Sequence, residues 1–253
     1  MTSRNGRNLF LVLGNQLFNP DELLEKGCTD VYMSEDFGLC TYQKHHKLKL
    51  YLFLTAMREY RDALLSKGIN VHYNKLENLK VSKSYFDNFS AYLKGKDFHK
   101  IFMYQIEDKP FEEESINYFK RVEKEIEFIK SPMFLFSREE LREFQGDSSK
   151  YRMVNFYKKS RLNLNLLVDE EGNPEGGKWN YDSDNRKSPN LNLDIPNPHI
   201  AEIDSITEEV IELVKKNFAG HFVKLDNFYF SVTRLDALKV LAQFVEERLV
   251  YFG

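Results

Sequence analysis

The sequence predicts an α/β fold built on a five-stranded parallel sheet with helices on both faces. Five short apolar runs alternate with helix-like segments through the first half of the chain. These runs are not cleanly two-periodic, which is typical of strands that are covered on both faces. Of the 253 residues, 42% are hydrophobic, with 21 Phe and 14 Tyr, so the chain can bury a sizeable core.

The order of strand and helix candidates through residues 8–129 indicates the parallel arrangement. The strand candidates are Asn8–Leu13, Asp30–Ser34, Asn70–Tyr73, Lys100–Tyr104 and Glu127–Ile129. A strong helix is predicted between the second and third strands, because apolar residues recur at helical spacing from Leu50 to Leu64 and Gly68 supplies a stop. Further helices are expected over 83–94 and 112–125.

The second half of the chain changes character. Ser137 and Glu140 form a capping-box pattern that predicts the start of a short helix, and residues 150–167 are expected to form another. A loop rich in Gly, Pro, Asn and Asp follows over 169–199, and two more helices are expected over 205–218 and 233–252. We therefore divide the chain into an α/β domain at 1–135, a helix and long inter-domain connection at 136–200, and the start of a helical domain at 201–253.

The last expected helix is apolar on more than one side. Leu235, Leu238 and Leu249 lie with other apolar residues on one face, whereas Val240 and Phe244 add apolar surface elsewhere. Such a helix needs more than one packing partner, and the chain ends directly after it. We therefore expect either partner sequence beyond these residues or a dimer formed through this helix.

Composition limits the class of protein. The net charge of −3 and the isoelectric point near 6.1 give no global drive toward nucleic acid, so any such contact requires a local basic patch. Cys28 and Cys40 are the only cysteines, which disfavours a disulfide framework and cannot supply a four-cysteine cluster. No stretch is long enough for a signal peptide or a membrane span, so we expect a cytoplasmic protein with no membrane partner.

Polar residues follow the predicted strands where an α/β sheet binds its ligands. Gly14, Asn15, Gln16 and Leu17 follow the first strand, and Glu35 follows the second. Amide side chains both donate and accept hydrogen bonds, and a carboxylate accepts from a ring N–H. The pattern suits a heterocycle better than a triphosphate, since neither G-x-G-x-x-G nor a Walker loop is present. The alternative is that Asn15 caps a turn and Glu35 pairs with a surface base.

A basic and aromatic helix follows the α/β region. Arg152, Lys158, Lys159 and Arg161 alternate with aromatic residues, as in helices that contact phosphates, so these four cations are candidate nucleic-acid contacts. A solvated helix face is the alternative explanation.

The segment Pro174–Lys187 contains the only tryptophan. It opens on a Gly-Gly pair and closes on an acid–amide–base cluster. Paired glycines permit close backbone approach, and the rings of Trp179 and Tyr181 need a surface against which to pack. The segment is therefore either a loop that attaches to its own domain or a docking element for another part of the protein.

The ordered set of motifs resembles the photolyase-related proteins, the iron–sulfur bacterial cryptochromes and (6-4) photolyases, along nearly the whole chain. Each motif is weak alone, but their order is specific. The motifs are Leu11-Val-Leu-Gly-Asn-Gln-Leu17, His45-His-Lys47, Phe53-Leu-Thr-Ala-Met57, Met153-Val-Asn-Phe-Tyr157, Gly176-Gly-Lys-Trp-Asn-Tyr-Asp182, Asp184-Asn-Arg-Lys187, Gly220-His-Phe222 and Val232-Thr-Arg234.

This resemblance implies an N-terminal antenna domain, with a Rossmann- or flavodoxin-like sheet, that binds 6,7-dimethyl-8-ribityllumazine at its strand ends. It also implies a C-terminal helical domain with FAD, a [4Fe–4S] cluster and a lesion pocket for light-dependent repair of DNA or blue-light signalling. The implied antenna residues are Gly14, Asn15, Gln16, Leu17 and Glu35. The family usually has Asp at the position of Asn15, which is a departure because an amide also donates hydrogen bonds.

By this resemblance the chain corresponds to the N-terminal portion, and residues 201–253 begin the flavin-type domain. FAD and the cluster are expected only in the absent C-terminal half, so we assign no catalytic and no metal-binding residue here. Trp179, Tyr181 and Arg186 are expected to dock against that half, as part of the inter-domain connection. Two other functions stay open: a nucleotide- or small-molecule-binding α/β protein that acts alone, and a protein-interaction module.

Overall fold

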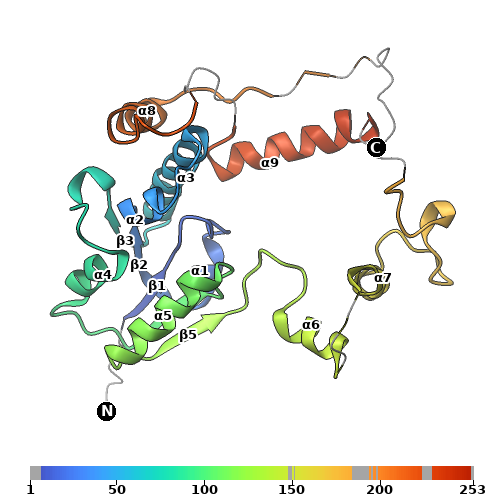
Figure 1. Cartoon of the computed structure of the whole chain (residues 1–253), viewed down its shortest axis with the longest axis horizontal. Coiled ribbons are helices and arrows are strands. Elements are labelled where there is room, and N and C mark those ends of the chain that lie inside the picture. The colour runs from blue at the N-terminus through green and yellow to red at the C-terminus, as the bar shows by residue number, and fades with distance from the viewer. Residues whose placement is uncertain are drawn as a thin grey trace. The chain divides into compact units, whose positions relative to one another are not determined.

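The computed structural model describes residues 7–147, 150, 152–183, 194, 196–197, 199–223 and 230–251. They form two compact units (Figure 1). The first unit comprises residues 1–133 and 198–243, and the second comprises 134–197 and 244–253. The first unit is therefore assembled from two separate stretches of sequence.

A five-stranded parallel sheet forms the centre of the first unit, as predicted. The strands are β1 (Asn8–Leu11), β2 (Cys28–Ser34), β3 (Asn70–Asn74), β4 (Lys100–Tyr104) and β5 (Ile126–Ile129). Their order in the sheet is β3-β2-β1-β4-β5, and every adjacent pair is parallel. The strand order reverses at β1, so the loops that follow β1 and β4 flank the switch point.

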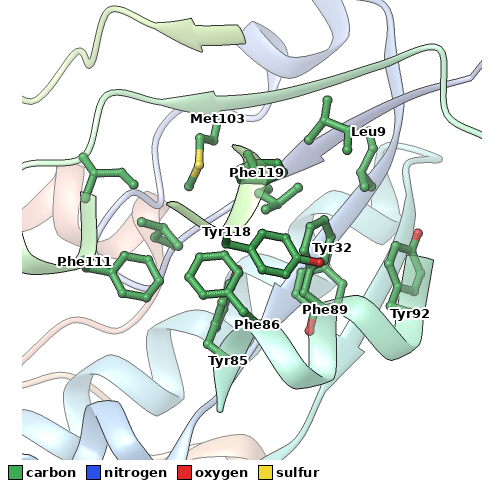
Figure 2. Packing of buried hydrophobic residues seen from close by; sticks show 14 of the residues in the cluster. Leu9, Tyr32, Tyr85, Phe86, Phe89, Tyr92, Met103, Phe111, Tyr118 and Phe119 are labelled. Carbon is green, nitrogen blue, oxygen red and sulfur yellow. The ribbon is translucent and has the colours of Figure 1, made fainter. Parts of the chain in front are cut away.

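Helices cover both faces of the sheet, which confirms the predicted fold class. On one face, α4 (Tyr85–Leu93) and α5 (Lys109–Arg121) pack aromatic rings against strand residues such as Leu9 and Met103. Figure 2 shows this cluster, in which the rings of Tyr32, Phe86, Phe89 and Tyr118 gather under the strands. Alternate strand residues belong to this cluster because side chains along a strand point to opposite faces.

The other face of the sheet is covered by α1 (Asp21–Glu25) and α3 (Lys47–Ser66). Phe10 and Phe102, the strand neighbours of Leu9 and Ile101, pack here against Met57, Tyr60 and Leu64 of α3. The observed α3 matches the predicted helix and continues to Ser66. The short helices α1 and α2 (Phe37–Thr41) were not predicted, since five residues are too few to show an apolar period.

A third layer lies on the outer side of α3. The helix α8 (Ser205–Asn217) packs against it, and the two ribbons lie side by side in Figure 1. Val210, Val214 and Phe218 are buried there against Tyr51 and Leu54. The apolar residues of α3 thus serve two interfaces, one with the sheet and one with α8.

The second unit contains α6 (Arg138–Gln145), α7 (Met153–Leu164) and the loop after α7. Both hydrogen bonds of the predicted capping box are present, from the backbone N–H of Glu140 to Ser137 Oγ and from that of Ser137 to the Glu140 carboxylate. Phe136 and Phe144 pack on Phe156, at centroid distances of 5.4 and 5.2 Å. The unit is held mainly by these rings and by the loop contacts described below.

The expected helix over 233–252 is corrected by the structure. The α-helix α9 covers only Arg234–Gln243, a π-helical turn covers Phe244–Arg248, and a 3-10 turn covers Leu249–Tyr251. Wider and tighter turns at the end of a helix shift the side chains around its axis. The apolar residues therefore do not share the single face that a continuous α-helical period predicts.

Candidate functional site at the strand ends

The loop after β1 lies at the switch point of the sheet. Leu13 accepts a hydrogen bond from the backbone N–H of Gln16 at 2.9 Å, so Gly14 and Asn15 occupy the centre of a tight turn. The side chain of Asn15 is exposed, whereas Gln16 is fully buried and Leu17 is half-buried. The turn thus presents one amide outward and directs the other inward.

Gln16 joins the two loops that flank the switch point. Its Nε2 donates to the backbone carbonyl of Gln105 at 2.8 Å and to Glu107 Oε2 at 2.9 Å, both in the loop after β4. Because the amide nitrogen is held by these acceptors, the orientation of the amide is fixed. Its Oε1 is buried and accepts no hydrogen bond, and neither does Glu107 Oε1. Among the described residues, these two oxygen acceptors at the switch point therefore have no donor.

Gly14 is required by close packing with α3. A Cβ atom at this position would lie 2.7 Å from Sδ of Met57, which is itself buried. A side chain here would have to displace the thioether, so glycine lets the loop approach the helix.

Glu35 lies directly after β2 and is held by four hydrogen bonds. Arg58 donates to its two oxygens at 2.7 and 3.0 Å, Tyr73 Oη donates at 2.7 Å, and the backbone N–H of Leu76 donates at 2.6 Å. Both Arg58 and Glu35 have fully buried side chains. The expected contact of this carboxylate with a ligand N–H is not supported, because both oxygens already accept two hydrogen bonds. The alternative, pairing with a surface base, is also wrong, since the base is buried.

Sequence reasoning missed Arg58, the centre of this network. Besides Glu35, its guanidinium contacts Glu77 at 2.8 Å and Glu209 of α8 at 3.1 Å. Burial by itself lowers the pKa of Arg58, but the hydrogen bonds and charges of Glu35 and Glu77 outweigh burial and raise the pKa, so the guanidinium stays charged. A signal was present: Arg58 follows Leu54 by four residues and so lies on the same buried face of α3.

Other polar atoms near the strand ends are also buried and have no hydrogen-bond partner in the part of the chain that the structure describes. Asp36 caps α2 by accepting from the backbone N–H of Leu39 at 2.8 Å, yet its Oδ2 accepts nothing. Burial raises the pKa of Asp36, and it raises that of Tyr85, whose hydroxyl likewise lacks a partner. Buried polar atoms without partners are uncommon and are usually completed by water or a ligand.

Three of the four candidate cations in α7 and directly before it are accessible to solvent. Arg152 and Lys159 are exposed and Lys158 is half-buried. Arg161 is buried and donates to the backbone carbonyls of Leu166, Leu167 and Trp179. The prediction that Arg161 contacts nucleic acid is corrected for this reason, since its guanidinium holds the following loop in place.

The tryptophan loop attaches to α7 within its own unit. The guanidinium of Arg161 lies 5.1 Å from the centroid of the half-buried Trp179 ring, and Tyr181 Oη donates to the carbonyl of Gly176 at 2.7 Å. These contacts are those expected of a loop that attaches to its own domain. Docking of Trp179 and Tyr181 elsewhere stays a prediction, and Arg186 lies outside the described residues.

The histidines before α3 serve its N-terminus. His46 caps the helix, accepting from the backbone N–H of Leu48 at 3.2 Å, and His45 is buried.

Among the described residues, no group of His, Cys, Asp and Glu could hold a metal ion, and no helix is long and apolar enough to cross a membrane. Cys28 and Cys40 are free and buried, and burial raises the pKa of each thiol to about 12.

Comparison with known sequences shows the family. The profile of the deoxyribodipyrimidine photo-lyase-related proteins matches residues 10–230. The chain belongs to this family. It is 28% identical over 248 residues to a (6-4) photolyase of Agrobacterium fabrum (strain C58 / ATCC 33970), an alignment that covers 97% of this chain and 49% of that protein. The chain thus spans about half the length of this photolyase-related relative and matches its N-terminal half.

Proposed function

We propose that this chain is the antenna-chromophore-binding portion of a photolyase- or cryptochrome-like flavoprotein that acts in light-dependent DNA repair or blue-light signalling. The observation that carries the proposal is Gln16. It is fully buried at the switch point, its amide is fixed by two acceptors, and its Oε1 lacks a donor. A ligand ring or side chain with an N–H or O–H group would supply that donor.

The residues of this loop fit the chromophore that the family resemblance implies, 6,7-dimethyl-8-ribityllumazine. Gln16 and Asn15 would supply hydrogen bonds and Leu17 apolar contact, while Gly14 lets the loop that carries them pack closely on α3. Glu35 acts through Arg58 and Leu76, as a residue that positions the end of β2. The bound chromophore would absorb light and pass the excitation energy to a flavin. FAD and the [4Fe–4S] cluster are assigned outside these residues.

DNA is the proposed partner of the full-length protein. Arg152, Lys158 and Lys159 are the candidate phosphate contacts in this chain, since all three are at least partly accessible. For Trp179 and Tyr181, docking against the domain that would hold the flavin is the proposed alternative to an accessible surface.

Reconstitution with the lumazine tests the proposal. The purified chain is incubated with the chromophore, freed of excess ligand and scanned for a bound visible band. We expect Gln16→Leu to weaken binding about 5- to 100-fold, because a buried hydrogen bond is lost and Glu107 loses its amide partner. Gln43→Leu is the matched control, since Gln43 is exposed and its amide contacts the ring of His45 rather than the loops after β1 and β4.

Two results would argue against antenna binding. One is the absence of any lumazine or flavin-like band after reconstitution of a folded chain. The other is equal affinity of the Gln16→Leu protein, with unfolding curves that show the variant to be as stable as the parent.

A second candidate function, a protein-interaction module, is favoured by α9. Leu235, Leu238 and Leu241 of this helix are 67%, 49% and 58% exposed. Adjacent exposed leucines of this kind mark interaction surfaces in soluble proteins. Sedimentation velocity over a range of concentrations tests the dimer, and Leu238→Glu should abolish any concentration dependence. A parent chain that stays monomeric at all concentrations would exclude self-association through α9.

A further inference from the structure

The second unit carries a surface on which lysines and aromatic rings alternate. It consists of Tyr157, Lys158, Lys178, Trp179 and Tyr181, and we call it the aromatic–cationic surface. Nζ of Lys158 lies 5.6 Å from the centroid of the Trp179 ring, and Nζ of Lys178 lies 5.7 Å from that of Tyr181. Tyr157 and Tyr181 are 44% and 45% exposed, and Trp179 is partly exposed. Cations and accessible rings are therefore adjacent at each point of this surface.

We propose that the aromatic–cationic surface binds single-stranded nucleic acid, with bases stacked on its rings and phosphates paired with its lysines. The proposal rests on the proposed role in DNA repair and adds to it the form of nucleic acid and the contact surface. Chromophore binding at the strand ends is measured separately, so either proposal can fail while the other stands.

The charge of α7 and of the residues directly before it favours a polyanion. From Lys150 to Val168 the sequence has five Lys or Arg and no Asp or Glu, although the whole chain has a net charge of −3. Arg152 and Lys159 extend the positive charge along α7 beyond the aromatic–cationic surface. The loop after α7 begins with Asp169, Glu170 and Glu171, and the acidic residues nearest to Trp179 in the sequence are Glu175 and Asp182, one on each side. A phosphate backbone that follows α7 would therefore meet only cations along the helix.

The rings are held in place and leave area for stacking. Lys158 and Arg161 are three residues apart on α7, so both approach Trp179 from the side of the helix. Arg161 also fixes the backbone of the loop, through its hydrogen bond to the Trp179 carbonyl at 3.1 Å. The hydroxyl of Tyr181 is fixed by the carbonyl of Gly176. Rings that are already ordered lose little conformational freedom when a base stacks on them.

The combination of lysines and aromatic rings favours single-stranded nucleic acid over an acidic peptide or duplex DNA. An acidic peptide would use the cations but has no planar groups for three aromatic rings. Duplex DNA offers phosphates, but its base faces are already stacked. A single strand offers both phosphates and free base faces, and proteins that bind single strands combine a positive groove with aromatic platforms.

Trp179 is the only tryptophan, so its fluorescence reports on this surface alone. We would excite the full chain at about 295 nm, where indole absorbs, and titrate it with oligothymidylate and with polyglutamate at several salt concentrations. Quenching by oligothymidylate is expected, with polyglutamate giving much less. If Arg152, Lys158, Lys159 and Lys178 each contact one phosphate, log Kd should vary with log salt with a slope of about 3.

Variants separate stacking from charge, with binding measured by the anisotropy of labelled oligothymidylate. Trp179→Ala should weaken binding roughly 5- to 150-fold, as loss of one stacked base predicts, while Trp179→Phe retains most of the affinity. Lys158→Ala should lower the salt slope by about 0.7. Lys216→Ala, an exposed lysine of α8 in the first unit, removes the same charge and should change neither quantity.

Three outcomes would overturn the proposal. The first is no change in fluorescence or anisotropy at protein concentrations up to about 100 µM in low salt, within the range where even non-specific binding is detected. The second is equal binding by the Trp179→Ala and parent proteins. The third is equal quenching by polyglutamate, which would make this a surface for acidic proteins.

Discussion

Replacement of Arg58 by Met provides a strong test of how the first unit is stabilised. The substitution keeps an unbranched side chain in α3 but removes the charge that holds Glu35. Tyr73 and Leu76 would then be the only hydrogen-bond donors to a carboxylate whose side chain is fully buried. Loss of one partner of a buried ion pair typically costs about 3–5 kcal/mol of the free energy of unfolding, because the other charge stays uncompensated.

We expect this cost to be large compared with the total free energy of unfolding of the domain. Domains of this size unfold with about 5–15 kcal/mol. A loss of about 3–5 kcal/mol corresponds to a fall in Tm of roughly 6–20 °C for a chain of about 150–250 residues. Urea unfolding followed by far-ultraviolet circular dichroism should show a lower midpoint with an unchanged slope.

Arg61→Met is the matched control. Arg61 lies one turn further along α3 and pairs with Asp62 at 2.6 Å, but both side chains are partly exposed. An exposed ion pair contributes about 0–1 kcal/mol. The double substitution Glu35→Gln with Arg58→Met should recover part of the loss, since no buried charge is left without a partner. Equal unfolding midpoints for Arg58→Met and Arg61→Met would refute this account of the buried pair.

Two further perturbations have defined outcomes. Gly176 and Gly177 both have φ of +74°, but only at Gly176 would a Cβ collide with Tyr181 Oη. Both alanine variants should lose about 1–2 kcal/mol through backbone strain, and only Gly176→Ala should also release the Tyr181 ring, seen as a change in near-ultraviolet circular dichroism. Burial, followed by the neighbouring Asp204, raises the pKa of Glu59 from 4.5 to about 7. The folded chain therefore binds this proton more tightly, and stability falls as pH rises from about 4.5 to about 7. After allowance for partial exposure, this decline in the free energy of unfolding amounts to about 1 kcal/mol, and Glu59→Gln should remove it. A variant whose stability follows the same pH profile as the parent would contradict this assignment to Glu59.

The fold was predictable because its signals are local and repeated. All five strands were identified, since each is a short apolar run between turn residues, and α3 shows an apolar period over about four turns, from Leu50 to Leu64. The predicted capping box at Ser137 is present, because both partners lie within four residues. These features depend on neighbours in the sequence and need no tertiary information.

The candidate site was only partly predictable. The position of Gln16 after β1 follows from the strand pattern, but its bonds to the loop after β4 join residues about ninety positions apart. The network around Arg58 likewise joins β2, α3 and α8. Pairing of charges across such distances depends on how the elements pack, and a single sequence gives no measure of that packing.

The layer that α8 adds to α3 also affects the order in which this protein can fold during synthesis. The sheet is complete in sequence at Ile129, yet the outer side of α3 stays uncovered until Phe218 has left the ribosome. At about 5–20 residues per second, the residues between these points take roughly 4–18 s to translate. During that interval Leu50 and Leu54 are exposed and Arg58 lacks one of its three carboxylate partners. A chaperone that shields apolar helix faces would have its clearest substrate in that nascent chain.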